Sequence, residues 1–169
     1  MQSTFGASIG GTRITTATIQ KSTLTGVQME SSSNIRFTQN KVIGYYQQRL
    51  TNNSLIDANT FNAPSVGVTA GMVISSGGTG NRINGNTMDG HWSGNPDDFF
   101  VNGADDGIVL ENENGCEVNG NTITNNWDAS IESTGSLTNC TISNNKLSNN
   151  MVCAIGGWYW NSWKGNMIS

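Results

Sequence analysis

Two adjoining segments, Asp106-Gly-Ile-Val-Leu-Glu111 and Gly115-Cys-Glu-Val-Asn-Gly-Asn-Thr-Ile123, decide the fold of this chain. In the first segment, Ile108 and Leu110 occupy alternate positions, as they do in a strand with one buried face. In the second segment, apolar residues again alternate with polar ones around a bend at Asn121. Together the two segments have the pattern of one full turn of a solenoid.

This unit recurs as an apolar residue, two residues of any kind, Asn, one further residue and a second apolar residue. The Asn residues of its copies are Asn40, Asn59, Asn86, Asn121, Asn145 and Asn166. A degenerate first copy, Ile14–Ala17–Ile19, has Ala in the Asn position. Because the spacing is mostly in the twenties and helix formers are sparse, the repeat indicates a β-solenoid.

A second set of strands lies upstream of each Asn and keeps step with it. Its copies begin with a small residue at Gly6, Gly26, Gly44, Gly71, Gly107, Ser130 and Ala154. We therefore predict a single all-β domain over residues 1–169, with about seven coils and essentially no helix. Stacked Asn amides carry both donors and an acceptor, so we expect an internal Asn ladder.

The repeats resemble those of the right-handed parallel β-helix superfamily, which has the pectin-lyase-like fold. The likeness is closest to NosD-like and carbohydrate-binding or sugar-hydrolase repeats, whose coils read D-G-I-x-L followed by I-x-x-N-x-I. Asp106–Leu110 and Val118–Ile123 match this pattern, and the resemblance extends over roughly residues 5–169. It implies a right-handed solenoid and sugar-related activity. It transfers no catalytic residues, because these motifs are structural in that superfamily.

Composition restricts the partners that we expect. Only 12% of the residues are charged and the net charge is −4, which argues against nucleic acid and anionic membranes as partners. No apolar run approaches the roughly 20 residues of a membrane span. A polysaccharide or oligosaccharide fits this composition better. We expect an extracellular, cell-surface or phage-particle protein, although this chain shows no signal peptide.

Both ends of the solenoid look incomplete. The last copy stops just after Asn166, and no capping helix precedes the first coil. Exposed solenoid ends are edge strands, which invite association. We therefore expect a fragment of a longer protein, a partner chain over the ends, or self-association through them.

The interval between Asn86 and Asn121 is 35 residues, which predicts a loop insertion over residues 89–106. A loop this long on a solenoid is commonly functional. It contains His91, Trp92 and the aspartates Asp97, Asp98, Asp105 and Asp106.

Acidic residues next to the insertion are the candidate catalytic groups. Alignment of Ile108 with Ile131 gathers five carboxylates on one exposed face: Asp105, Asp106, Glu111, Asp128 and Glu132. Glu111 and Glu132 would lie roughly 8 Å apart, one coil and two strand residues from each other. Inverting glycoside hydrolysis uses carboxyl groups about 6.5–9.5 Å apart, one as proton donor and one as base. Solvated surface acids and ordinary Asp-Gly turn chemistry are the alternative interpretation.

We predict no cofactor and no metal site, and we keep calcium as an alternative. Its ligands would be Asp97, Asp98, Asp105 or Asp106, although the spacing matches no EF-hand or calcium-repeat loop. The lone His91 and the cysteines lack the ligand spacing of a zinc site.

Aromatic residues near the acids are the candidate substrate-binding groups. Indole rings stack well on the apolar faces of sugars. With His91, we expect the following tryptophans to line a groove: Trp92, Trp127, Trp158 and Trp160. The alternative is that Trp92 and Trp127 pack under their own turns.

The cysteines have a definite register. Cys116 and Cys140 each precede an Asn by five residues, so we expect them to stack inside adjacent coils. That separation is compatible with a disulfide, but buried free thiols are favoured. Cys153 also has inward parity.

These patterns predict a polysaccharide-active β-helix, with glycoside hydrolysis favoured over lyase chemistry. β-Elimination from uronates usually uses a basic residue or calcium near the substrate, and only Arg82, Lys146 and Lys164 lie near the relevant coils. The alternative is a non-catalytic carbohydrate-binding, adhesin or phage-tail structural solenoid.

Overall fold

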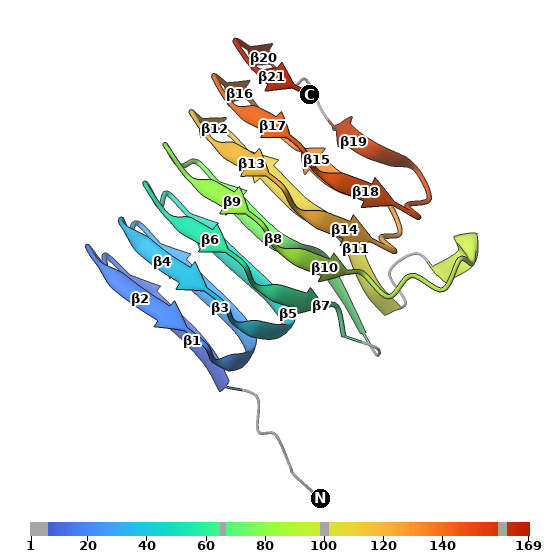
Figure 1. Cartoon of the computed structure of the whole chain (residues 1–169), viewed down its shortest axis with the longest axis horizontal. Helices are drawn as coiled ribbons and strands as arrows, with labels where there is room; N and C mark the ends of the chain where they lie inside the picture. Colours follow the sequence, from blue (N-terminus) through green and yellow to red (C-terminus); the bar gives the residue numbers. More distant parts are fainter. Residues whose placement is uncertain (1–6, 65–66, 99–101, 159–161) are drawn as a thin grey trace, which may run out of the picture.

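The protein is a parallel β-solenoid whose coils stack along one axis (Figure 1). The structure is a computed structural model and describes residues 7–64, 67–98, 102–158 and 162–169. All strand pairs among these residues are parallel, and their only helical element is the 3-10 turn η1 (Pro96–Asp98). The predicted all-β solenoid is confirmed.

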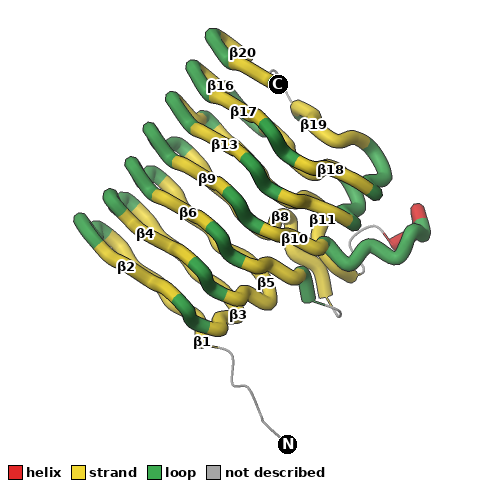
Figure 2. Tube along the Cα trace, viewed as in Figure 1, coloured by secondary structure: helices red, strands yellow, loops and turns green. Residues whose placement is uncertain are grey.

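Two of the three sheets are built from short strands. One is a seven-stranded sheet of β2 (Ala17–Gln20), β4 (Ile35–Thr38), β6 (Leu55–Asp57), β9 (Arg82–Asn84), β13 (Glu117–Asn119), β17 (Thr141–Ser143) and β21 (Met167–Ile168). A smaller sheet contains β12 (Glu113–Asn114), β16 (Leu137–Thr138) and β20 (Trp163–Lys164). Bends separate the sheets and stack in rows along the solenoid (Figure 2).

The third sheet has eleven strands in two limbs that meet at β5. The short limb contains β7 (Thr60–Asn62), β10 (Thr87–Asp89), β14 (Thr122–Thr124) and β18 (Lys146–Ser148). The other limb, called the long-strand limb below, contains β1 (Ala7–Thr12), β3 (Thr23–Glu30), β5 (Lys41–Arg49), β8 (Gly67–Ser76), β11 (Asn102–Glu111), β15 (Ala129–Ser133) and β19 (Cys153–Gly157). This limb carries the candidate site.

The core is built from ladders of equivalent side chains. Ile56 pairs with Ile83, which pairs with Val118, and all three are buried. Phe61 pairs with Met88 in the same way on the short limb. Each coil has too little apolar surface to fold alone, so stacking supplies the common interior.

The predicted internal Asn ladder is present. Oδ1 of Asn86 accepts hydrogen bonds from both the backbone N–H and the side-chain amide of Asn59, each at 3.0 Å. The amide of Asn86 donates to the carbonyl of Ile56 at 2.9 Å and to Oδ1 of Asn121 at 3.0 Å. The same contacts join the ladder residues Asn40, Asn59, Asn86, Asn121 and Asn145.

Asn166 does not belong to this ladder, which corrects the sequence prediction. Trp163 pairs with Leu137, so Asn166 lies one bend earlier in its coil than the ladder residues. Its Oδ1 accepts the backbone N–H of Cys140 at 2.8 Å. The pattern was misleading because an apolar residue precedes more than one bend of each coil.

The first copy of the repeat is also displaced. Ile19 pairs with Phe37, and the backbone N–H of Ser22 donates to Oδ1 of Asn40 at 3.0 Å. The degenerate copy is therefore Ile19–Ser22–Leu24 and not Ile14–Ala17–Ile19. Ser22 occupies the Asn position.

The upstream copies beginning at Gly44 and Gly71 are one residue out of register. Gly26 pairs with Tyr45, and Gly71 pairs with Asp106. The cause is the corner between the two limbs, where the strands are irregular. Consecutive residues such as Met72 and Val73 are both buried there, so strict alternation fails. Gly6 lies outside the described residues.

Cys116 and Cys140 stack inside adjacent coils, as predicted, with their Cα atoms 4.5 Å apart. They form a disulfide, whereas the sequence argument favoured free thiols. Equivalent positions of neighbouring coils lie close enough for this bond without a change of the backbone.

Candidate functional site

The insertion between β10 and β11 is shorter than predicted. β10 includes Asp89 and β11 begins at Asn102, so the connection covers residues 90–101. Its described part projects beside the stack of coils (Figure 1). Asp105 and Asp106 are strand residues, which gives them a defined position.

Four of the five predicted carboxylates come together on β11, β15 and the residue preceding β15: Asp105, Asp106, Asp128 and Glu132. We call them the acid cluster. The backbone N–H of Asp128 donates to the carbonyl of Asp105 at 2.8 Å, which places these residues on adjacent coils. Glu132 pairs with Val109, and its carboxyl group is hydrogen-bonded to that of Asp106. Asp106, Asp128 and Glu132 are only 3%, 7% and 8% exposed.

Asp106 lies on the outer face because of the irregular corner. It pairs with Gly71, where an added Cβ would meet the side chains of Val109 and Ile74. Asp106 therefore lies on the same face as Val109 and its neighbour Glu132. Gly107 turns inward, because a Cβ there would meet the buried side chain of Ile123, and it would also lie 2.5 Å from the Ser130 carbonyl. Glycine is required at this position by the close approach of the next coil.

Burial and mutual repulsion hold a proton in the acid cluster. Burial, helped by the charge of Glu132, raises the pKa of Asp106 well above its ordinary value, although the hydrogen bond from Ala129 N–H opposes this. Burial also raises the pKa of Glu132, while its hydrogen bond with Asp106 lowers it. The pair therefore shares one proton, carried by Asp106. Burial and the charges of Asp128 and Glu132 raise the pKa of Asp105 to about 6.

Two carboxylate oxygens of the acid cluster have no donor among the residues that the structure describes. Among the described residues, no hydrogen-bond partner reaches the buried Oδ1 of Asp105 or Oδ1 of Asp128. Trp158 does donate a hydrogen bond to the Asp128 side chain. A buried acceptor without a donor costs free energy, and a ligand that brings hydroxyl groups would remove that cost.

Glu111 is not part of the acid cluster. Its Oε2 accepts a hydrogen bond of 2.8 Å from Ser76 Oγ, on the preceding coil. The charges that raise the carboxyl pKa values of the cluster come from its own members. The structure therefore offers Asp106 with Glu132 as the close carboxyl pair, in place of Glu111 with Glu132.

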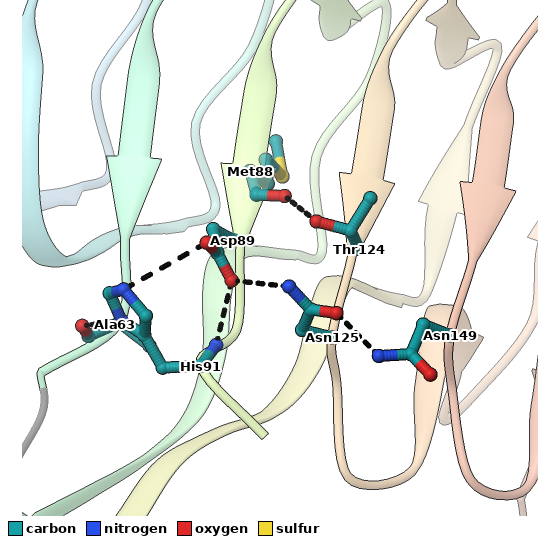
Figure 3. Close-up of polar contacts among 7 residues, drawn as sticks. All are labelled: Ala63, Met88, Asp89, His91, Thr124, Asn125 and Asn149. Atoms are coloured by element: carbon teal, nitrogen blue, oxygen red, sulfur yellow. Dashed lines mark hydrogen bonds and ion pairs between the residues drawn. The ribbon is translucent and has the colours of Figure 1, made fainter. Parts of the chain in front are cut away.

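His91 belongs to a row of polar contacts at the end of the short limb (Figure 3). Its Nδ1 lies 2.7 Å from the Ala63 carbonyl, and its Nε2 lies 3.8 Å from Oδ2 of Asp89. Oδ1 of Asp89 also accepts a hydrogen bond from Asn125, which in turn accepts one from Asn149. These contacts tie the start of the insertion to both neighbouring coils.

Two of the predicted substrate-binding tryptophans hold the insertion. The indole N–H of Trp92 donates to the Asn95 carbonyl at 2.9 Å, and that of Trp127 donates to the Pro96 carbonyl at 3.2 Å. Trp158 is 46% exposed and contacts the acid cluster through Asp128. Trp160 lies outside the described residues.

Cys153 is next to the acid cluster, which the sequence argument missed. A Cβ on Gly156 would meet Sγ of Cys153 at 2.6 Å, and Gly156 pairs with Glu132 on the outer face. Burial, together with the charges of Asp128, Asp106 and Glu132, raises the pKa of this thiol. The prediction that Cys153 faces inward is wrong, because the alternation of inward and outward residues changes at the corner between the two limbs.

The calcium alternative gains no support from the geometry. Within the described ranges, no three His, Cys, Asp or Glu side chains are grouped so that they could hold a metal ion. Asp97 is exposed in η1, where its backbone N–H donates to Oδ1 of Asn95 at 3.1 Å.

None of the residues that the structure describes form a helix that is long and apolar enough to cross a membrane.

Comparison with known families gives one match that covers nearly the whole chain. The family described as "Right handed beta helix region" matches residues 5–168. A comparison with curated proteins finds no match. The family match concerns the fold, and it includes every residue of the acid cluster.

Proposed function

The chain belongs to the right-handed β-helix family, and we propose that it hydrolyses glycosidic bonds of a polysaccharide at the acid cluster. A fold alone does not determine an activity, so the proposal depends on the site. One observation carries it: the carboxyl pair that shares a proton, Asp106 with Glu132, lies beside two buried carboxylate oxygens to which none of the described residues donates.

Each member of the cluster has a chemical part in this proposal. Asp106 is protonated at neutral pH and donates its proton to the leaving oxygen as the glycosidic C–O bond breaks. Asp105 is ionised above about pH 6 and takes a proton from the water that attacks the anomeric carbon. Glu132 keeps the transferable proton on Asp106. Asp128 accepts a hydrogen bond from a sugar hydroxyl, and the half-exposed Trp158 stacks on the ring.

The pH dependence of this mechanism follows from the same groups. The rate rises with pH as Asp105 loses its proton, so the acid limb of the profile has its midpoint near pH 6. The rate falls again at alkaline pH, where Asp106 loses its proton. A bell-shaped profile is expected.

The experiment is a screen of purified protein against neutral and acidic polysaccharides, read as release of reducing ends. Asp106→Asn and Asp105→Asn are expected to lower kcat on the order of 10²- to 10⁴-fold. Glu111→Gln is the matched control, because Glu111 bonds to Ser76 outside the cluster. Cleavage that is unchanged by both Asp variants would refute the proposal.

A structural solenoid is the second candidate function, and one observation favours it. Large apolar side chains are roughly half exposed on the last coil: Val152, Trp158, Met167 and Ile168. A partner stacked on β18–β21 would cover such groups. Self-association that Ile168→Asp abolishes, without cleavage of any glycan, would support this candidate. Either function fits a protein outside the cell, on a cell surface or in a phage particle.

A further inference from the structure

We propose that a polar hollow at the first coils of the long-strand limb is a second binding site, which takes a neutral sugar unit of the glycan that reaches the acid cluster. This inference rests on the proposed function for its ligand class. The hollow has a volume of about 400 Å³ and lies on β1, β3 and β5. Its polar lining includes Thr12, Gln28, Glu30, Gln47 and Arg49.

The hollow exists because one coil lacks a side chain. Gly10 pairs with Gln28, and Gln28 pairs with Gln47, so the three positions form one column across adjacent coils. A Cβ at Gly10 would have no atom of the described residues within 4 Å. The missing side chain therefore leaves open space beside two amides.

The chemistry of the lining fits hydroxyl groups. Each Gln amide offers two donors and one acceptor, and a sugar hydroxyl is both donor and acceptor. Nε2 of Gln28 already donates to the Tyr45 hydroxyl at 3.1 Å, which holds that amide in place. The Tyr45 ring lies over Gly26, whose added Cβ would be 3.4 Å from it.

The charges of the lining favour a neutral sugar. Nη1 of Arg49 and Oε1 of Glu30 form an ion pair of 3.5 Å, so the two charged groups of the hollow neutralise each other. An acidic sugar would have to draw Arg49 away from Glu30. A neutral unit leaves the pair intact and contacts the amides.

The hollow lies in line with the acid cluster. Gln47 pairs with Ile74, Ile74 with Val109, and Val109 with Glu132, all on the long-strand limb. Three strand spacings separate Gln47 from Glu132, which is about 14 Å. Ile74 and Val109 form an apolar strip between the two polar sites. An extended glycan across the limb would contact the hollow, the strip and the cluster together.

The test fills the hollow and measures binding against glycan length. Gly10→Leu adds a side chain where no atom of residues 7–64 obstructs it, and Gln28→Ala removes an amide. The probes are cello-, xylo- and malto-oligosaccharides of two to eight units, with galacturonate oligomers as the acidic comparison. They are titrated calorimetrically against protein that also carries Asp106→Asn, which slows turnover. Thr18→Leu is the matched control, since Thr18 is exposed on β2 of the other sheet.

The expected result is a Kd about tenfold higher for the long oligomers of one series in Gly10→Leu and Gln28→Ala, with no change for dimers or in the control. Equal affinities of all four proteins at every length, or tighter binding of galacturonate oligomers than of neutral ones, would overturn the inference. Its failure is separable from that of the proposed function. If cleavage requires Asp106 but Gly10→Leu changes neither cleavage nor binding, only the second binding site is refuted. If binding depends on oligomer length as expected but no glycan is cleaved, only the proposed hydrolysis is refuted.

Discussion

Two rows of buried polar side chains run across the coils, and they differ in how well their hydrogen bonds are satisfied. In the Asn ladder, Asn86 accepts two hydrogen bonds from Asn59 and donates to Ile56 and Asn121. In the acid cluster, the described residues supply no donor to Oδ1 of Asp105 or Oδ1 of Asp128. The interior row stabilises the solenoid, whereas the outer row costs stability and has unused capacity for a ligand.

The difference follows from the chemistry of the two side chains. An amide is donor and acceptor at once, so identical residues in successive coils satisfy each other. An ionised carboxylate only accepts, so stacked carboxylates repel unless a proton joins them. Asp106 and Glu132 are joined in this way. Asp105 and Asp128 are not joined in this way, and their Oδ1 atoms have no donor in the described part of the chain.

Removing one member of the ladder is expected to have the largest effect. Asn86→Ala leaves the amide of Asn59 and the carbonyl of Ile56 without their partners inside the solenoid. We expect the free energy of unfolding to fall on the order of 3–4 kcal/mol, measured by urea denaturation. Asn114→Ala, at an exposed Asn, is the control and should change it by at most about 0.5 kcal/mol. Equal effects of the two substitutions would mean that the ladder adds no stability.

Most of the scaffold could be predicted because its signal repeats. Phe37, Ile56, Ile83 and Val118 occupy one ladder, as their positions before successive Asn residues indicated. The errors fall where the repeat is locally ambiguous. Asn166 has apolar neighbours at the right spacing but belongs to an earlier bend, since only strand pairing distinguishes the bends.

The candidate site could be predicted in part. Alignment of Ile108 with Ile131 brought the acid cluster together, and the pairing of these two residues confirms the alignment. Glu111 was included because its position is near the cluster, but Ser76 on the preceding coil binds it. Such partners cannot be inferred from a sequence, since they depend on side-chain direction. The same limit applies to Trp92, which bonds to a backbone carbonyl of its own loop.

Asp106→Asn removes the carboxyl group that shares a proton with Glu132. It should change the free energy of unfolding less than Asn86→Ala does, and it should raise that free energy. A carboxyl group whose pKa is raised in the folded state binds its proton more tightly than the unfolded chain does, so stability falls as pH rises above the ordinary value of 3.8. The raised pKa of Asp105 makes the protein lose stability between pH 3.8 and about pH 6, and the raised pKa of Asp106 extends this loss into the alkaline range. Asp106→Asn should therefore be more stable than the parent by about 2 kcal/mol at pH 8.

The measurement is urea unfolding at pH 4, 6 and 8. The gain in Asp106→Asn should be largest at pH 8 and small at pH 4, which lies only just above the ordinary carboxyl pKa of 3.8, so that the folded and unfolded states still differ little in bound protons. Asp97→Asn, at an exposed Asp, is the control and should give the same difference at all three values. A gain of equal size at pH 4 would show that packing, and not the buried carboxyl, causes it.

Trp127 directly precedes Asp128 of the acid cluster, and its substitution should show the smallest effect. Its indole N–H holds the insertion through the Pro96 carbonyl, so Trp127→Phe loses one hydrogen bond and keeps most of the ring. We expect a loss of about 1 kcal/mol or less in unfolding free energy and faster proteolysis within residues 90–98. Trp163→Phe, at an exposed Trp on β20, should leave the proteolysis rate unchanged. If Trp127→Phe instead weakens oligosaccharide binding and leaves proteolysis as it was, Trp127 contacts the ligand, and the binding surface extends from the acid cluster toward the insertion.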